Sequence, residues 1–246
     1  MSAEFLNIDC REYMREQADG AFDIAITSPP YNMNLRVRNG EYCSRQIVKE
    51  LSTKYERYAD NLPMDEYRQF ITEVALELAR VSTIAFFNIQ MITGNKPALF
   101  KMLGDCAEII KELIVWDKGP AQPAIGENTL NSRYELIVVL SKQAKTRQFT
   151  ECNFERGTLD NIWQIGKNVS ATGSHRAGFP VALTDRILSN FSKAGDMVFD
   201  PFLGTGTTAI SAHKHNCSFV GCEIDMEYCE IAKTRFRNET AQMVLY

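Results

Sequence analysis

Long apolar runs are missing from this sequence, although hydrophobic residues make up 45% of its 246 residues. A helix that crosses a membrane needs about 20 consecutive apolar residues, and no segment of the chain has them. The first residues, Met1 to Glu4, also lack the charged and apolar regions of a signal peptide. We therefore expect a cytoplasmic protein without a membrane partner.

Metal-binding patterns are absent as well. The seven cysteines include no C-x-x-C pair, and the closest set, Cys217, Cys222 and Cys229, does not have the spacing of zinc ligands. His213 and His215 flank a lysine, which favours surface positions over a metal site. The sequence therefore predicts reduced thiols and no bound metal.

An excess of positive charge is the third missing feature. The net charge is −4, whereas proteins that bind nucleic acids usually carry a basic surface. Residues 33–61 are a local exception, because they combine Tyr42, Tyr55 and Tyr58 with six cations, namely Arg36, Arg38, Arg45, Lys49, Lys54 and Arg57. Cations and aromatic rings suit phosphate contact and base stacking. We expect this segment to be mobile and to contact DNA through Arg36, Arg38, Arg45 and Lys49; the alternative is a solvated helical face.

The segment Thr27-Ser28-Pro29-Pro30-Tyr31-Asn32 follows an apolar run, residues 22–26, that is typical of a buried strand. Two consecutive prolines fix φ and donate no backbone N–H, so we expect a rigid turn whose carbonyl groups are free. Open α/β sheets bind their ligands at the carboxyl ends of strands. A hydroxyl from Ser28, a rigid carbonyl and the ring of Tyr31 suit a planar base that carries an amino group. An ordinary strand-to-loop turn is the alternative.

Alternating strands and helices indicate an α/β fold with a mostly parallel sheet. The apolar patterns predict strands at residues 5–8, 22–26, 83–89, 109–116, 134–140, 197–199 and 218–222. Helices are predicted at residues 11–17, 64–80, 97–103, 180–191 and 226–237, with one more starting near residue 207. In this interpretation one domain spans residues 1–246, and residues 142–174 are a weakly patterned polar region within it.

A second chemical site is predicted where Asp200-Pro201-Phe202-Leu203-Gly204-Thr205-Gly206-Thr207-Thr208 joins a strand to a helix. Its glycines allow close approach of a ligand, and the N–H groups at the start of the helix favour an anionic group. Glu223 follows at the end of the next strand, where a carboxylate can accept hydrogen bonds from ribose hydroxyls. The segment is neither G-x-G-x-x-G nor a P-loop, since no lysine follows its second glycine. S-adenosylmethionine fits these features better than a dinucleotide or a nucleoside triphosphate.

With these two sites in this order, the chain resembles the β-class DNA amino-methyltransferases, bacterial or phage modification enzymes in which the catalytic motif precedes the cofactor motif. The resemblance covers residues 7–237 and is carried by five segments, which are residues 27–31, 134–142, 174–180, 198–208 and 220–225. It implies the Rossmann-like fold of S-adenosylmethionine-dependent methyltransferases. The implied sheet has seven strands, one of them antiparallel, and is circularly permuted so that the cofactor half comes last.

The resemblance also implies roles for individual residues. The catalytic motif corresponds to Ser28, Pro29, Pro30 and Tyr31. The implied cofactor-binding residues are Asp9, Thr27, His175, Phe179, Pro180, Asp200, Pro201, Phe202, Gly204, Gly206, Thr207 and Glu223. Asp9 is expected near the adenine of the cofactor and Glu223 at its ribose. Residues 142–174 correspond to the target-recognition region, which is too short here to favour a long recognition sequence.

In such an enzyme the target base leaves the duplex, at a cost of about a few kcal/mol, and stacks on Tyr31. Ser28 and the Pro29 carbonyl would accept the N–H bonds of the amine and orient its lone pair towards the sulfonium methyl group. No metal or covalent nucleophile is required. Methylation at cytosine C5 is disfavoured, because it needs an activated cysteine and the sequence has no Pro-Cys dipeptide.

Several alternatives stay open at this point. Serine at the first motif position favours cytosine N4, with adenine N6 as the alternative and an amine of RNA as a less favoured substrate. Glutamine methylation usually goes with Asn-Pro-Pro-Tyr, which this chain lacks. A DNA-binding protein without activity would not need Ser28 and Glu223 together. The expected partners are double-stranded DNA, a second copy of the chain in a homodimer and, as a candidate, a cognate restriction endonuclease.

Overall fold

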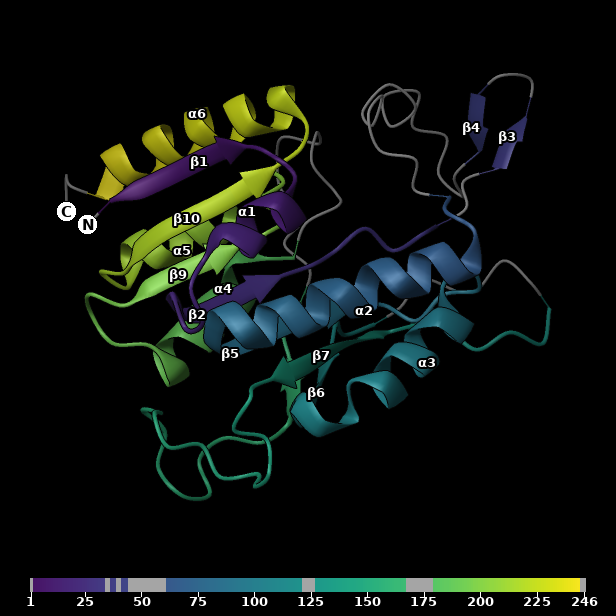
Figure 1. The fold of residues 1–246 in the computed structure, drawn as a ribbon, viewed down its shortest axis with the longest axis horizontal. Coiled ribbons are helices and arrows are strands. Elements are labelled where there is room, and N and C mark those ends of the chain that lie inside the picture. The colour runs from purple at the N-terminus through teal and green to yellow at the C-terminus, as the bar shows by residue number, and fades with distance from the viewer. Residues whose placement is uncertain are drawn as a thin grey trace.

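A computed structural model describes residues 2–33, 36–38, 41–43, 61–120, 127–166 and 179–243. It has three layers, in which an eight-stranded sheet lies between two layers of helices (Figure 1). Within these residues, no helix is both long enough and apolar enough to cross a bilayer.

The strand order of the large sheet is β1-β10-β9-β2-β5-β7-β6-β8. The strands are β1 (Ala3–Asn7), β2 (Phe22–Thr27), β5 (Ser82–Ile89), β6 (Ile110–Asp117), β7 (Tyr134–Leu140), β8 (Ile162–Gln164), β9 (Met197–Asp200) and β10 (Ser218–Glu223). β7 pairs antiparallel with both of its neighbours, and the other pairs of this sheet are parallel. The start of β7 therefore lies at the same edge as the ends of the other strands.

Helices cover both faces of the sheet in the described part of the chain (Figure 1). The first layer contains α1 (Cys10–Glu16), α2 (Met64–Val81) and α3 (Lys96–Asp105), followed by a 3-10 helix at Ala107–Ile109. The second contains α4 (Val181–Phe191), α5 (Thr207–Lys214) and α6 (Met226–Met243). Along β7, Val138 and Leu140 pack in the core of the first layer, whereas Ile137 and Val139 pack in that of the second. A strand buried on both faces explains the continuous apolar pattern of this segment.

β2 and β9 are neighbours at the centre of the sheet, although they are far apart in the sequence. From β2 the chain continues through α2 to β5, which is the neighbour of β2 in the strand order. From β9 it continues through α5 to β10, which is the neighbour of β9 in the opposite direction along the sheet. The two connections leave in opposite directions and lie on opposite faces. Such a point opens a crevice at the carboxyl ends of the strands. The segments that carry the two predicted chemical sites meet there.

The predicted permuted α/β architecture is confirmed, with the catalytic strand β2 ahead of the cofactor strands β9 and β10. The prediction of seven strands was wrong, because β8 adds an eighth beside β6. Its central residue, Trp163, is completely buried and anchors this short edge strand. The last helix continues beyond residue 237 to Met243. The sequence did not predict this extension, because Asn238, Glu239 and Thr240 interrupt the apolar pattern.

The basic segment is described only in part, as a separate two-stranded sheet of β3 (Arg36–Arg38) and β4 (Glu41–Cys43). Its strands are antiparallel, with Val37 opposite Tyr42. Arg36 and Arg38 thus belong to a strand, so the alternative of a continuous helical face does not hold for them. Arg45 and Lys49 lie outside the described residues.

The region predicted for target recognition begins at the opposite edge of the sheet. The Ser141 N–H donates to the carbonyl of Ile109, the residue before β6. The Ser141 hydroxyl donates to the Thr83 carbonyl at the start of β5. Further along, Phe149 and Phe154 pack edge-to-face on Phe191 at the end of α4. Residues 142–154 therefore begin at the edge of the sheet opposite to the catalytic turn, and the recognition role of residues 142–174 stays a prediction.

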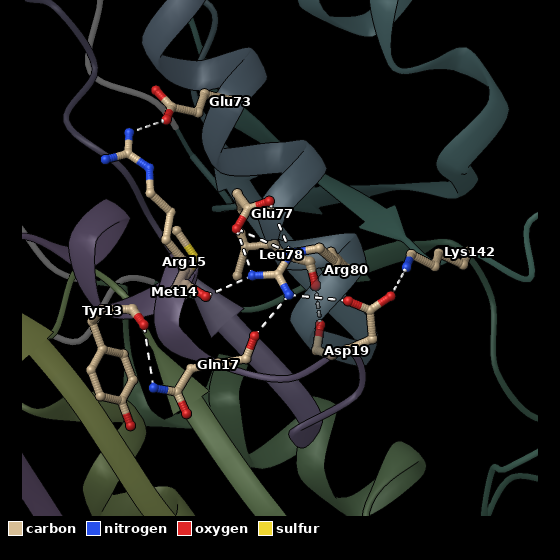
Figure 2. Close-up of polar contacts among 11 residues, drawn as sticks. Tyr13, Met14, Arg15, Gln17, Asp19, Glu73, Glu77, Leu78, Arg80 and Lys142 are labelled. Atoms are coloured by element: carbon tan, nitrogen blue, oxygen red, sulfur yellow. Dashed lines mark hydrogen bonds and ion pairs between the residues drawn. The ribbon is translucent and has the colours of Figure 1, made fainter.

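Arg80 joins the end of α1 to the end of α2 (Figure 2). Its guanidinium group donates to the backbone carbonyls of Met14, at 2.6 Å, and Gln17, at 2.8 Å. It also pairs with Glu77 on its own helix and with Asp19 in the loop that leads to β2. Arginine can make these bonds together because its donors form a planar fork. The side chain thus adds a second donor to the Met14 carbonyl, which already accepts the Gln17 N–H at 3.0 Å, and supplies a donor to the Gln17 carbonyl just after α1.

We predict that Arg80→Met lowers the free energy of unfolding by about 1–3 kcal/mol, because two partly buried carbonyls lose charged donors. Arg68→Met is the matched control, since Arg68 lies on the same helix and its ion pair with Asp105 is substantially exposed. The control should lose about 1 kcal/mol or less. Urea denaturation of both variants measures the difference, and equal losses would contradict the capping role of Arg80.

Candidate active site

The predicted site residues gather at the carboxyl edge of the sheet, around the ends of β1, β2, β9 and β10. The register pairs Asn7 with Glu223 at the ends of β1 and β10. The Ile8 N–H donates to the Glu223 carbonyl at 3.1 Å, which brings Asp9 beside the end of β10. Parallel pairing therefore places three segments predicted to bind the cofactor next to the catalytic turn.

Asp200 connects the catalytic strand to the cofactor loop. Its carboxylate accepts hydrogen bonds from the Thr27 hydroxyl at 2.9 Å, the Thr208 hydroxyl at 2.6 Å and the Phe202 N–H at 3.0 Å. The side chains of Asp200, Thr27 and Thr208 are all buried. Burial raises the pKa of Asp200 to about 6, and the three donors oppose that rise.

The catalytic turn is held by two asparagine side chains. Asn32 adopts a left-handed conformation with φ of 55°, and its amide donates to the carbonyls of Leu62, at 3.0 Å, and Gly94, at 3.2 Å. Asn95 donates to the carbonyls of Tyr31, at 2.8 Å, and Gln90, at 3.0 Å. These bonds fix the backbone on the carboxyl side of the two prolines.

The expectation that the carbonyl groups of the turn are free was wrong for Pro30. The Tyr67 hydroxyl on α2 donates to the Pro30 carbonyl at 2.8 Å. Within the described part of the chain, nothing donates to the Pro29 carbonyl. Of these two carbonyl oxygens, the one of Pro29 is therefore available to a ligand, and the one of Pro30 is not.

A buried polar cluster surrounds the hydroxyl group of Tyr31. Ser28 donates to this hydroxyl at 2.8 Å, and the hydroxyl donates to Glu135 Oε2 at 2.8 Å. Asn88 Nδ2 lies 2.8 Å from both oxygens, and Lys118 Nζ lies 3.0 Å from Glu135 Oε1. Burial first and the neighbouring Glu135 second raise the pKa of Tyr31 well above its ordinary value.

The sequence predictions missed Asn88, Lys118 and Glu135. Asn88 and Glu135 are polar residues in apolar strands, which is the signal that could have identified them. Lys118 belongs to a Pro-rich loop that gave no such signal, yet it is buried.

The cofactor loop turns sharply through two glycines with positive φ, Gly204 and Gly206. A Cβ atom at Gly206 would lie 3.2 Å from the Cβ of Ala232, so the loop packs closely on α6. Arg235 on the same helix donates to the Thr205 carbonyl, at 3.2 Å, and to the Thr207 hydroxyl, at 3.1 Å. Arg235 therefore holds the cofactor loop from the side of α6.

Glu223 and Asp9 already have hydrogen-bond partners in the protein. Glu223 accepts from the N–H groups of Gly204, at 2.9 Å, and Asp225, at 3.0 Å, one on each carboxylate oxygen. Burial raises its pKa. Asp9 caps α1 by accepting from the Arg11 N–H at 2.8 Å, and it also pairs with the Arg11 guanidinium group. Arg11 in turn lies over the ring of Phe70.

The remaining predicted cofactor residues lie in different parts of the structure or outside its described residues. Phe202 packs edge-to-face on Phe70, which joins the cofactor loop to α2. Pro180 is buried just before α4, and Phe179 packs against the core of the second layer. His175 lies outside the described residues.

We predict that the raised pKa of Asp200 makes stability depend on pH. Below about pH 4 the carboxyl group is protonated in both the folded and the unfolded states. As the pH rises through about 6, the folded state resists ionisation and loses up to about 3 kcal/mol of stability. In Asp200→Asn this loss disappears, so the free energy of unfolding of the variant relative to the wild type should rise between pH 4 and pH 7.

Asp117→Asn serves as the control of opposite sign. The ion pair with Arg133 holds the pKa of Asp117 below its ordinary value, so this carboxylate stabilises the folded state at neutral pH and loses that effect in acid. Denaturation at a series of pH values compares the two variants. A pH slope in Asp200→Asn equal to that of the wild type would contradict the prediction.

The comparisons with known proteins agree with this geometry. The family model described as DNA methylase, for N6 and N4 methyltransferases, matches residues 22–234. The chain is similar to the orphan methyltransferase M.BamHII of Bacillus amyloliquefaciens, with 42% identity over 90 residues, which are 34% of each protein. The matched region thus spans about a third of that relative.

Solved structures show a similar fold. The PvuII cytosine-N4-specific DNA methyltransferase has a TM-score of 0.70 at 16% identity, with 98% of this chain and 91% of the other covered. The M1.HpyAVI complex with S-adenosylmethionine has a TM-score of 0.61 at 19% identity, with coverages of 96% and 100%. The fold confirms the Rossmann-like class, and the family match covers most of the chain. The chain belongs to the N6/N4 DNA methylase family, whose members take the methyl group from S-adenosylmethionine.

Proposed function

We propose that this protein transfers a methyl group from S-adenosylmethionine to the exocyclic amine of a flipped DNA base, and that the base is cytosine. The observation that carries the proposal is the direct bond between the two predicted sites. The Thr27 hydroxyl, at the entrance to the catalytic turn, donates to Asp200, at the entrance to the cofactor loop. A methyl donor and a methyl acceptor bound at these sites would be neighbours, which in-line transfer at about 3–3.5 Å requires.

The cofactor would lie across the ends of β9 and β10. Each oxygen of Glu223 accepts one N–H bond and has a second lone pair, so the carboxylate can still accept two ribose hydroxyls. Asp9, beside the end of β10, would face the adenine, and the loop through Gly204 and Gly206 would hold the amino-acid end. The raised pKa of Glu223 is consistent with a buried carboxylate that lacks further donors.

The target amine would bind at the catalytic turn. The Ser28 hydroxyl and the Pro29 carbonyl would accept its two N–H bonds, which draws the nitrogen towards a pyramidal shape and frees its lone pair for the methyl group. The ring of Tyr31 would stack on the flipped base. No residue needs to form a covalent bond with the substrate in this scheme.

Cytosine N4 is favoured over adenine N6 by the serine at position 28. The similar PvuII enzyme is described as cytosine-N4-specific, which supports the same choice. Adenine N6, and an amine of RNA, are the outcomes against which the choice is tested.

We further propose that double-stranded DNA contacts residues 33–61, through phosphate bonds from Arg36, Arg38, Arg45 and Lys49. The strand pair of β3 and β4 stands apart from the main sheet, beyond the start of α2 (Figure 1). That position is compatible with a DNA-contacting arm next to the catalytic turn. A homodimer and a cognate restriction endonuclease complete the proposed partners.

Two substitutions should separate the two sites. We predict that Glu223→Ala weakens the binding of S-adenosylmethionine by about tenfold to a hundredfold, because charged hydrogen bonds to ribose are lost. Ser28→Ala should change that affinity by less than about twofold while lowering turnover. Calorimetric titration of cofactor into both variants measures the affinities, with Glu227→Ala as an exposed control on α6. Equal losses of affinity in the two variants would contradict the division of roles.

We predict N4-methylcytosine as the product in DNA. Duplexes and RNA are incubated with the enzyme and labelled cofactor, then digested to nucleosides and analysed by mass spectrometry. Ser28→Ala is the control for contaminating activity. A label found only in N6-methyladenine would contradict the choice of base, and a label found only in RNA would contradict the choice of DNA.

A further inference from the structure

A chain of hydrogen bonds runs from the catalytic serine to a buried ion pair. It passes from Ser28 through the Tyr31 hydroxyl to Glu135, with a distance of 2.8 Å at each step. Glu135 then pairs with Lys118 at 3.0 Å, and these two side chains are only 8% and 6% exposed. No part of the proposed methyl transfer uses Glu135 or Lys118 directly.

The donors and acceptors in this chain can be assigned from chemistry alone. Glu135 is paired with a lysine, so it is a carboxylate that only accepts hydrogen bonds. The Tyr31 hydroxyl has one proton, and it must donate that proton to Glu135. The hydroxyl therefore has only lone pairs left for its other neighbours.

Asn88 fits the same assignment. The Asn88 atom next to the Glu135 carboxylate must be the amide nitrogen, which also donates to the Tyr31 hydroxyl. The other amide atom, Asn88 Oδ1, is buried and has no hydrogen-bond partner in the described part of the chain. The amide thus keeps the orientation that Glu135 requires, even though its own acceptor is left without a donor.

The proton of Ser28 is fixed as a consequence. With both its proton and one lone pair engaged, Tyr31 can only accept from Ser28, so the serine hydroxyl must donate to Tyr31. Both lone pairs of Ser28 Oγ are then available away from Tyr31. A serine in this state can accept a hydrogen bond from an amine but has no proton left to donate to one.

We propose that Glu135, held ionised by Lys118, is a positioning residue that makes Ser28 a hydrogen-bond acceptor for the target amine. The inference rests on the proposed function, because it gives Ser28 its role towards a base amine. It extends that function by assigning the polarity of the catalytic hydroxyl to a residue on β7 that does not touch the substrate.

The test begins with Glu135→Gln. Glutamine keeps the shape of the side chain but has one acceptor atom for the three donors of Lys118, Tyr31 and Asn88. We expect the rate constant of methyl transfer in a single turnover to fall by about tenfold to a hundredfold. The dissociation constants for DNA and S-adenosylmethionine should change by less than about twofold, because Glu135 touches neither ligand. Glu112→Gln, a carboxylate on β6 that pairs with Arg147, is the matched control and should match the wild type.

A double-mutant cycle then asks whether Glu135 acts through Tyr31. Tyr31→Phe removes the hydroxyl group that links Glu135 to Ser28. In that background, Glu135→Gln should lower the rate constant by less than about twofold, because the connection is already broken. A full loss in the Tyr31→Phe background would overturn the proposal, and so would an unchanged rate in Glu135→Gln alone.

A second variant keeps Glu135 and removes its cation. In Lys118→Met the buried Glu135 has no ion-pair partner, so protons compete more strongly for this carboxylate, and a protonated Glu135 would donate to Tyr31 instead of accepting from it. The methyl-transfer rate of this variant should fall more steeply at low pH than that of the wild type and recover as the pH rises. A pH profile parallel to the wild type would overturn the proposal even if Glu135→Gln does not fold. A wild type that methylates no base amine overturns the proposed function and this inference together, whereas an active wild type with unaffected variants overturns only the role of Glu135.

Discussion

The hydrogen bonds of Asp200 are the constraint on which the site depends. This one buried carboxylate joins the end of β2, the turn after β9 and the first residues of α5. The two chemical segments are more than 170 positions apart in the sequence, so parallel pairing alone would align their strands without fixing the loops. Asp200 fixes the loops to each other. Burying its ionised carboxylate costs free energy, and the hydrogen bonds from its three donors offset part of that cost.

Much of this arrangement could be predicted from the sequence. The apolar runs of β2 and β7 and the glycines at 204 and 206 are local signals, and each depends on a backbone requirement that a short segment reveals. The order of the two motifs was enough to predict the permuted sheet. Local signals of this kind also identified Ser28 and Glu223 as residues at strand ends.

Other features depended on contacts that no short segment contains. β8 has only three residues and exists because Trp163 is buried beside β6. The Pro30 carbonyl was expected to be free, yet Tyr67 reaches it from a helix more than 30 residues away. Glu135 and Lys118 acquire their significance only when β7 and its preceding loop are folded against the catalytic turn. The packing of Phe149 on Phe191 after β7 is likewise a contact between distant segments, which no short pattern in the sequence reveals.

The reversed direction of β7 has a consequence for the preorganisation of the site. In the parallel strands, residues reach the ligand edge only at their last position, and most functional groups there belong to loops. β7 instead enters the sheet at this edge, so its second residue, Glu135, is already paired with Trp116 of β6. A side chain on a paired strand has little freedom to lose when a substrate arrives, and the entropy of ordering it is spent during folding instead. β7, the strand that runs antiparallel to its neighbours in the large sheet, thus supplies a fixed point next to a turn that must admit a large and mobile base.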